Sequence, residues 1–184
     1  MSASTTSRHQ ALVIIDMQQG LCEGEGAAWQ TDVVIARINA LAARARAAGV
    51  PVIWVQHESA DELPLHSPGW ALAHGLQPHA DDHRVRKTTP DSFLRTDLPA
   101  LLERLQVQGL ILCGMHTEFC VDTTTRRALA LGYPVTLVAD AHTSAGNAAL
   151  TPAQTIAHHN ATLTNISSFG PRAQAIPAAE VSLP

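Results

Sequence analysis

The 184-residue sequence lacks several features that define common protein classes. No apolar run approaches the roughly 20 residues of a membrane-spanning helix, and the opening MSASTTSRHQ lacks the apolar segment of a signal peptide. Three cysteines are few and odd in number, which argues against a disulfide framework. The net charge of −4 gives no reason to expect binding to nucleic acid or to an anionic membrane. We expect a cytoplasmic protein with a disordered tail, residues 1–10, and a single domain, residues 11–184.

Two nucleotide-binding motifs are also missing. No GxGxxG follows the first apolar run, and the sequence contains no Walker A loop, so dinucleotide or nucleotide binding loses its main support. With 46% apolar and 15% charged residues, the chain is nevertheless long and apolar enough to bury a substantial core.

The apolar pattern predicts strands that alternate with helices. The expected strands are Ala11–Ile15, Val52–Gln56, Arg84–Lys87, Leu110–Cys113, Val135–Ala139 and Ala161–Ile166. The expected helices are Val33–Ala48 capped by Asp32, a helix capped by Thr96 or Asp97 that runs to Leu105, a helix from Thr117 to Gly132, and Pro152–His159 capped by Thr151. Met17–Ala28 is expected to be a loop. Such alternation predicts an α/β fold with a mostly parallel sheet and helices on both faces.

Cys120 occupies a position where a cysteine can be reactive. The apolar run before it ends at Gly114, and Thr117 stands where the cap of the next helix would be. Cys120 would then lie in the first helical turn, where the helix dipole and unpaired N–H groups favour the thiolate. A free cysteine can equally be a small buried apolar residue. Its assignment as a nucleophile therefore depends on its neighbours.

Asp16 and Lys87 supply suitable neighbours. Each of them ends an expected strand, so both can reach the carboxyl edge of the sheet together with Cys120, where open parallel sheets bind ligands. Alone, Asp16 could be a loop cap and Lys87 a surface lysine. Together, Lys87 would stabilise a thiolate, and Asp16 would accept the thiol proton and later return it.

The segment Ser59–His83, which follows His57 and Glu58, is rich in proline, glycine and histidine. Loops of this length in a compact domain are usually lids or binding loops. The histidine spacing is irregular and fits no metal motif, so we expect no metal ion. The candidate pocket residues are Gln18, His57, Trp70, Phe93, His116 and Phe119.

Five blocks of the sequence resemble the isochorismatase-like superfamily, in its cysteine hydrolase (amidohydrolase) branch. They are LVIIDMQQG, VIWVQHE, KTTPDSFLRTDL, ILCGMHTEFCVDTTTRRALALGY and VTLVADAHT. The most specific part is the GxxTxxCV pattern at Gly114, Thr117, Cys120 and Val121. The resemblance implies a Rossmann-like, three-layer α/β/α fold with about six strands in the order 3-2-1-4-5-6. It also implies a homo-oligomer, either a dimer or a tetramer.

The resemblance maps the family's catalytic triad onto Asp16, Lys87 and Cys120. It implies hydrolysis of a C–N bond in a small amide, lactam or ureido substrate through a thioester, with no cofactor. The block GMHTEFCVDTT is most similar to uncharacterised and streptothricin-hydrolase-like members. A cis peptide bond between Met115 and His116 is implied as well, with the N–H groups of His116 and Cys120 forming an oxyanion hole.

Two differences between this sequence and named branches of the superfamily narrow the reactions that the resemblance implies. Nicotinamidases carry a metal-binding Asp and His cluster just after the second strand, where this chain has Gln-His-Glu, which favours a metal-free member. Isochorismate-cleaving members lack the nucleophilic cysteine that this chain has.

A thiol-based redox or binding protein without turnover is the alternative. Cys113 weakens it, since it lies seven residues from Cys120, outside a CxxC motif, and is expected to face the core. Glu118 is expected to point away from Cys120, because a facing carboxylate would raise the thiol pKa.

Overall fold

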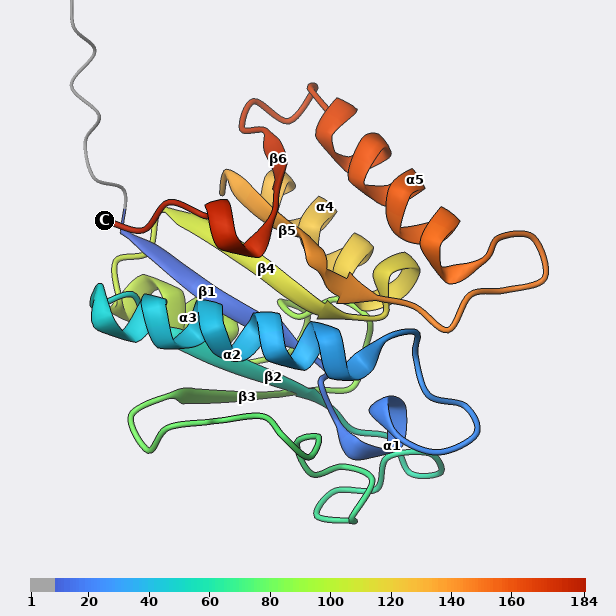
Figure 1. Cartoon of the computed structure of the whole chain (residues 1–184). Coiled ribbons are helices and arrows are strands. Elements are labelled where there is room, and N and C mark those ends of the chain that lie inside the picture. Colours follow the sequence, from blue (N-terminus) through green and yellow to red (C-terminus); the bar gives the residue numbers. More distant parts are fainter. Residues whose placement is uncertain (1–8) are drawn as a thin grey trace, which may run out of the picture.

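A computed structural model of the chain describes residues 9–184 and contains one parallel sheet (Figure 1). Its strands are β1 (Gln10–Ile15), β2 (Val52–His57), β3 (His83–Lys87), β4 (Gly109–Met115), β5 (Val135–Thr143) and β6 (Ala173–Ile176). Their order is β3-β2-β1-β4-β5-β6, and neighbouring strands are parallel. The predicted fold class and strand order are confirmed.

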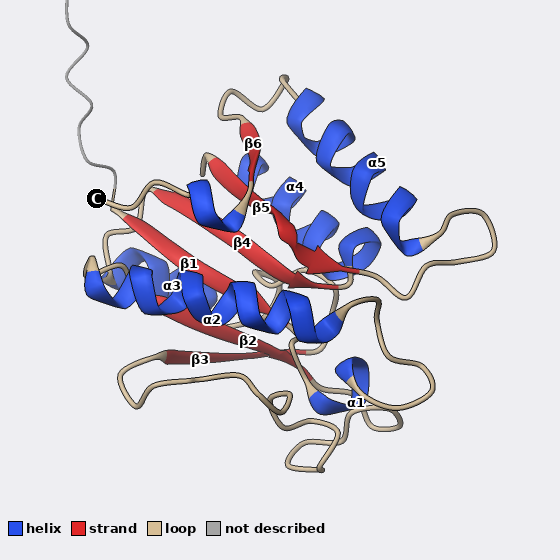
Figure 2. Ribbon diagram, viewed as in Figure 1, coloured by secondary structure: helices blue, strands red, loops and turns tan. Residues whose placement is uncertain are grey.

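Helices cover both faces of this sheet (Figure 2). They are α1 (Gln19–Cys22), α2 (Thr31–Ala47), α3 (Leu98–Arg104), α4 (Asp122–Ala130) and α5 (Pro152–Asn165), with a π-helical turn η1 (Thr117–Val121) and a 3₁₀ turn η2 (Ala178–Glu180). Helix α2 and η2 pack on one face, and α3 and α4 on the other. No helix within residues 9–184 is long and apolar enough to cross a membrane.

The buried strands explain why the sheet needs helices on both sides. In β1, Leu12 and Ile14 pack toward α2, whereas Val13 and Ile15 pack toward α3 and α4. All four side chains are fully buried. A strand that is apolar on both faces is stable only between two helical layers.

The strand predicted at Ala161–Ile166 is wrong. Ala161–Asn165 continue α5, which starts with a capping box formed by Thr151 and Gln154, and Ile166 is the C-cap of this helix. In this short segment, ATLTNI, apolar and polar residues alternate, and so short a pattern does not separate a strand from the end of a helix. The last strand is instead β6, Ala173–Ile176, where the sequence analysis expected no strand.

Several predicted helix starts are also corrected. Thr117 is not a cap: it is the first residue of η1, and His116 precedes it without a side-chain capping bond. Asp32 lies inside the first turn of α2, after Gln30. The start of α3 agrees with the prediction: Asp97 occupies the cap position, and the Thr96 hydroxyl accepts from the Leu98 N–H group at 3.2 Å.

Other predicted boundaries also move. The expected loop Met17–Ala28 contains the short helix α1. Strand β5 continues past Asp140 to Thr143. Strand β1 begins at Gln10, one residue before the predicted domain boundary, and residues 1–8 of the predicted tail lie outside the described residues.

Gly114 allows β4 to approach the end of β1 closely. It pairs with Ile15 and has a φ of +114°. A Cβ atom at this position would lie 2.1 Å from the Ile15 carbonyl oxygen and 2.6 Å from its nitrogen. Only glycine fits both the space and the backbone conformation, and the close approach brings Asp16 near the turn that carries Cys120.

Replacing Gly114 by alanine should therefore destabilise the protein by on the order of 3 kcal/mol, since strain and overpacking add. Gly132→Ala is the matched control, because Gly132 has a φ of +96° but nothing within 4 Å of its added Cβ. The control should lose only about 1 kcal/mol from backbone strain. Denaturant unfolding of both variants tests this, and equal losses would contradict the steric explanation.

Candidate functional site

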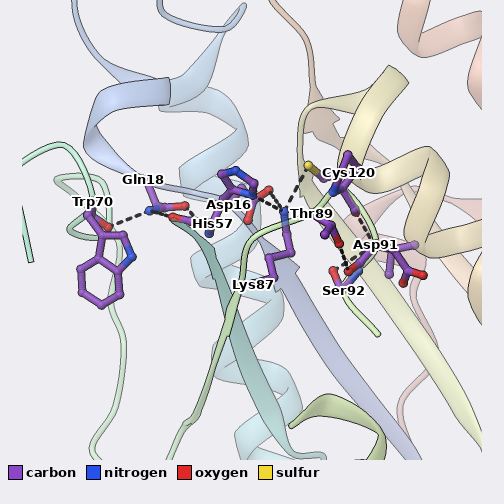
Figure 3. Close-up of polar contacts among 11 residues, drawn as sticks. Asp16, Gln18, His57, Trp70, Lys87, Thr89, Asp91, Ser92 and Cys120 are labelled. Carbon is purple, nitrogen blue, oxygen red and sulfur yellow. Dashed lines mark hydrogen bonds and ion pairs between the residues drawn. The ribbon is translucent and has the colours of Figure 1, made fainter. Parts of the chain in front are cut away.

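Asp16, Lys87 and Cys120 meet at the carboxyl edge of the sheet (Figure 3). Asp16 follows β1, Lys87 ends β3, and Cys120 lies in η1 after β4. The Lys87 Nζ atom is 2.6 Å from Asp16 Oδ2 and 3.2 Å from Cys120 Sγ. Asp16 and Lys87 are each only 1% exposed. The structure thus brings together the three residues that the sequence predicted to lie at this edge of the sheet.

Backbone geometry at the end of β1 directs the carboxylate of Asp16. The residue adopts a left-handed φ of +53°, a conformation that aspartate tolerates better than most residues. Its N–H donates to the Val55 carbonyl at 2.9 Å, so the chain is held against β2 as it leaves the sheet.

His57 is the third partner of the Lys87 ammonium. Its Nδ1 atom lies 3.2 Å from Lys87 Nζ. Burial and the charge of Lys87 lower the pKa of His57, which favours a neutral imidazole whose Nδ1 accepts. The three N–H groups of Lys87 therefore have three acceptors, on Asp16, Cys120 and His57.

Burial raises the pKa of the Cys120 thiol to about 12, and Asp16 adds to the rise through its charge and a hydrogen bond, while Lys87 opposes it. The resting residue is a thiol. Lys87 thus acts to favour the thiolate, as expected from the sequence, but burial and Asp16 outweigh it. Asp16 Oδ1 is buried without a hydrogen-bond partner among the described residues, so this carboxylate retains a free acceptor.

Gln18, predicted to line the pocket, is a buried residue whose side chain connects two backbone segments. It is 0% exposed. Its Oε1 accepts from the His57 N–H at 2.8 Å, and its Nε2 donates to the carbonyls of His57 and Trp70, both at 2.9 Å. It therefore ties the end of β2 to the loop that contains Trp70.

The predicted aromatic pocket residues lie in different environments. Phe93 is buried in the core and stacks on Tyr133 with ring centroids 6.1 Å apart. Phe119 is 58% exposed and lies beside His116, with ring centroids 6.4 Å apart. Trp70 is partly buried, and its Nε1 atom lacks a partner among the described residues.

The turn between β4 and Cys120 has an unusual backbone. The Met115–His116 peptide bond, which the resemblance implied to be cis, is cis in the structure. The His116 carbonyl accepts from the N–H groups of Phe119 and Val121, each at 3.1 Å. This pattern closes η1 as a π turn around Cys120.

Side chains of this turn reach residues that the sequence analysis did not select. The Ser144 hydroxyl donates to Glu118 Oε1 at 2.7 Å, and Glu118 is not among the charges that shift the pKa of Cys120. Thr117 Oγ1 lies 2.8 Å from Nδ1 of His142. Ser144 and His142 lie some 25 residues downstream of the turn, so no local pattern marks them.

The histidines of the long loop do not gather around a metal site. Within residues 9–184, no group of three or more His, Cys, Asp or Glu side chains could hold a metal ion. His74 pairs with Glu23 at 2.9 Å, and His79 with Asp81 at 3.3 Å. Of the histidines from His57 to His83, His57 is the one that contacts Lys87.

A parallel sheet of this order, with Cys, Lys and Asp at its carboxyl edge, defines a cysteine-centred α/β domain. Residues 10–168 match the isochorismatase domain model, and the chain belongs to the isochorismatase family.

Named relatives agree with this placement. A streptothricin hydrolase from Streptomyces noursei is 41% identical over 136 residues, covering 72% of this chain and 49% of that protein. The chain thus spans about half the length of the first curated relatives it matches. The crystal structure of an isochorismatase family protein superimposes with a TM-score of 0.84 at 35% identity, covering 93% of this chain and 99% of that one. A cysteine hydrolase from Pseudomonas syringae pv. phaseolicola 1448A gives 0.81 at 26%, covering 93% and 89%.

Asp16→Asn should lower the pKa of the Cys120 thiol, because it removes a carboxylate that raises this pKa and leaves the opposing charge of Lys87. At a fixed pH the thiolate fraction rises, so iodoacetamide should alkylate Cys120 faster. Peptide mass spectrometry as a function of pH measures both the rate and the apparent pKa.

Glu118→Gln is the matched control, since it makes the same carboxylate-to-amide change two residues from Cys120. Its alkylation profile should follow that of the unaltered chain. An Asp16→Asn profile shifted to higher pH, or not shifted, would contradict the role of Asp16 in setting the thiol pKa.

Proposed function

We propose that this protein is a cysteine hydrolase that cleaves a C–N bond of a small amide, lactam or ureido substrate through a thioester on Cys120. One observation carries the proposal: Asp16, Lys87 and Cys120 form a buried chain with contacts of 2.6 and 3.2 Å. The similarity to a streptothricin hydrolase and to a cysteine hydrolase supports the same reaction class.

In the first step the thiol sulfur attacks the substrate carbonyl while its proton moves to Asp16. The free Oδ1 atom of Asp16 is a suitable acceptor. Because the thiol pKa is high, a thiolate forms only as attack proceeds, and the Lys87 ammonium at 3.2 Å balances the negative charge on sulfur.

The carbonyl oxygen then becomes an oxyanion. Backbone N–H groups of His116 and Cys120 are its proposed donors, and a single donor of this kind typically contributes ~2.7–4 kcal/mol to the transition state. The N–H groups of Phe119 and Val121 are engaged with the His116 carbonyl instead.

Collapse of the tetrahedral intermediate breaks the C–N bond. The protonated Asp16 gives its proton to the leaving nitrogen, which departs as ammonia or an amine, or stays tethered as the free amine of an opened lactam, while the acyl group remains on sulfur. Asp16, again a carboxylate, removes a proton from water, and the resulting hydroxide attacks the thioester. Breakdown of this second intermediate returns the proton to sulfur and releases the acid.

The redox alternative lacks a nearby partner thiol. Cys22 and Cys113 are both buried in the core packed against α2, and burial raises the pKa of each. Cys113 Sγ faces the Val13 carbonyl at 3.9 Å.

Cys120→Ala should reduce hydrolysis by several orders of magnitude while leaving the melting temperature nearly unchanged, because the nucleophile is lost from a partly exposed position. Ammonia or amine release over a panel of small amides, lactams and ureido acids measures this. Cys113→Ala is the control: it should lower stability through a core cavity but preserve kcat. Turnover retained by Cys120→Ala would exclude the thioester mechanism.

Exhaustive chelation should leave turnover intact, because Gln56, His57 and Glu58 stand where the nicotinamidases carry their metal-binding cluster. Activity is compared before and after dialysis against a chelator, alongside elemental analysis. Stoichiometric zinc that is lost together with activity, and that restores activity when added back, would refute a metal-free reaction.

A further inference from the structure

His142 is a buried ionisable residue that the proposed chemistry does not use. It lies near the end of β5 and is 1% exposed, and burial lowers its pKa to about 4. Its Nδ1 atom is 2.8 Å from Thr117 Oγ1, and its Nε2 atom is 3.0 Å from Asn160 Oδ1. A neutral imidazole therefore connects α5 to the turn that carries Cys120.

The position of the proton on this ring follows from Asn160. The Asn160 Nδ2 group donates to the Ala139 carbonyl at 2.9 Å, so its Oδ1 atom faces His142 and accepts. His142 must then carry its proton on Nε2, which leaves Nδ1 as an acceptor for the Thr117 hydroxyl. The bonds run in one direction, from Thr117 through His142 and Asn160 to Ala139.

Thr117 is anchored differently from Thr125 and Thr155, two other buried threonines at or within helical segments. Thr125 and Thr155 each donate to the carbonyl four residues earlier, within or at the start of their own helical segment. Thr117 begins η1, and its hydroxyl bonds across to β5 instead. It is 0% exposed and lies between His116 and Cys120, which carry the proposed oxyanion donors.

We propose that His142 is a positioning residue for the Cys120 turn. Held by Asn160 with its proton on Nε2, it fixes the Thr117 hydroxyl and thereby the direction of the His116 and Cys120 N–H groups. This role in catalysis rests on the proposed function, whereas the order of the hydrogen bonds does not.

The first test is the tautomer of His142, read from ¹⁵N chemical shifts of the histidine-labelled protein at neutral pH. We expect a protonated Nε2 and an unprotonated Nδ1. In Thr117→Val, the Nδ1 resonance should shift further from the hydrogen-bonded value, because its donor is gone. A proton found on Nδ1 would overturn the proposal.

The second test separates acyl transfer from simple thiol reactivity. Acylation of Cys120 by p-nitrophenyl acetate develops an oxyanion, whereas alkylation by iodoacetamide does not. Thr117→Val should slow acylation by about 10- to 100-fold, since a small misplacement of oxyanion donors is costly, and should leave alkylation nearly unchanged. Thr117→Ser keeps the hydroxyl and should restore acylation.

Thr155→Val is the matched control, because it removes an equally buried threonine hydroxyl from α5. It should lose stability but keep both rates. If Thr117→Val fails to fold, Asn160→Leu replaces it: loss of the acceptor for the Nε2 proton should again slow acylation selectively.

If Thr117→Val slows acylation and alkylation equally, or slows neither reaction, the positioning role is wrong. A different result would contradict the proposed function itself. If the unaltered protein is alkylated but not acylated at Cys120, the hydrolase assignment is wrong, and the positioning role of His142 in catalysis is wrong with it.

Discussion

The ammonium of Lys87 is buried at the edge of the sheet, and the site depends on how this charge is satisfied. An unpaired ammonium away from water costs several kcal/mol, so the fold must supply acceptors for it. It does so with Asp16 Oδ2, Cys120 Sγ and His57 Nδ1. These acceptors come from the ends of β1 and β2 and from the turn after β4. The burial of this one charge therefore depends on the relative positions of several strand ends.

A few close contacts hold these strand ends in position. Gly114 lets the backbone of β4 approach Ile15, where a Cβ atom would collide. Gln18 holds the backbone of His57 with two hydrogen bonds. Apolar packing on both faces keeps the strands in place. Backbone contacts thus fix the ends of the strands, and these ends hold the site residues in a definite geometry.

The electrostatics of the site favour a neutral Cys120 thiol at rest. Desolvation is the largest cause of the raised pKa of Cys120, and the Asp16 carboxylate adds to it. The same carboxylate offers a buried acceptor for the proton. A base that keeps the thiol protonated at rest also protects it from adventitious oxidation, which attacks the thiolate. Proton transfer and attack are then coupled in one step of the proposed reaction.

The sequence alone determined the alternation of strands and helices, the parallel sheet and the three residues that meet at its edge. These follow from local patterns, because apolar runs buried on both faces mark central strands and the residues that end such strands share one edge. Other features depended on contacts between distant segments. The pattern of Ala161–Ile166 suited a strand as well as a helix, and packing of Leu163 against Val121 and Leu137 accompanies the helix that formed. The burial of Gln18 and Phe93, the bond from Thr117 to His142 and the high thiol pKa of Cys120 arise from neighbours far along the chain. Only the tertiary structure decided them, since solvent exclusion and long-range pairing have no signature in a short stretch of sequence.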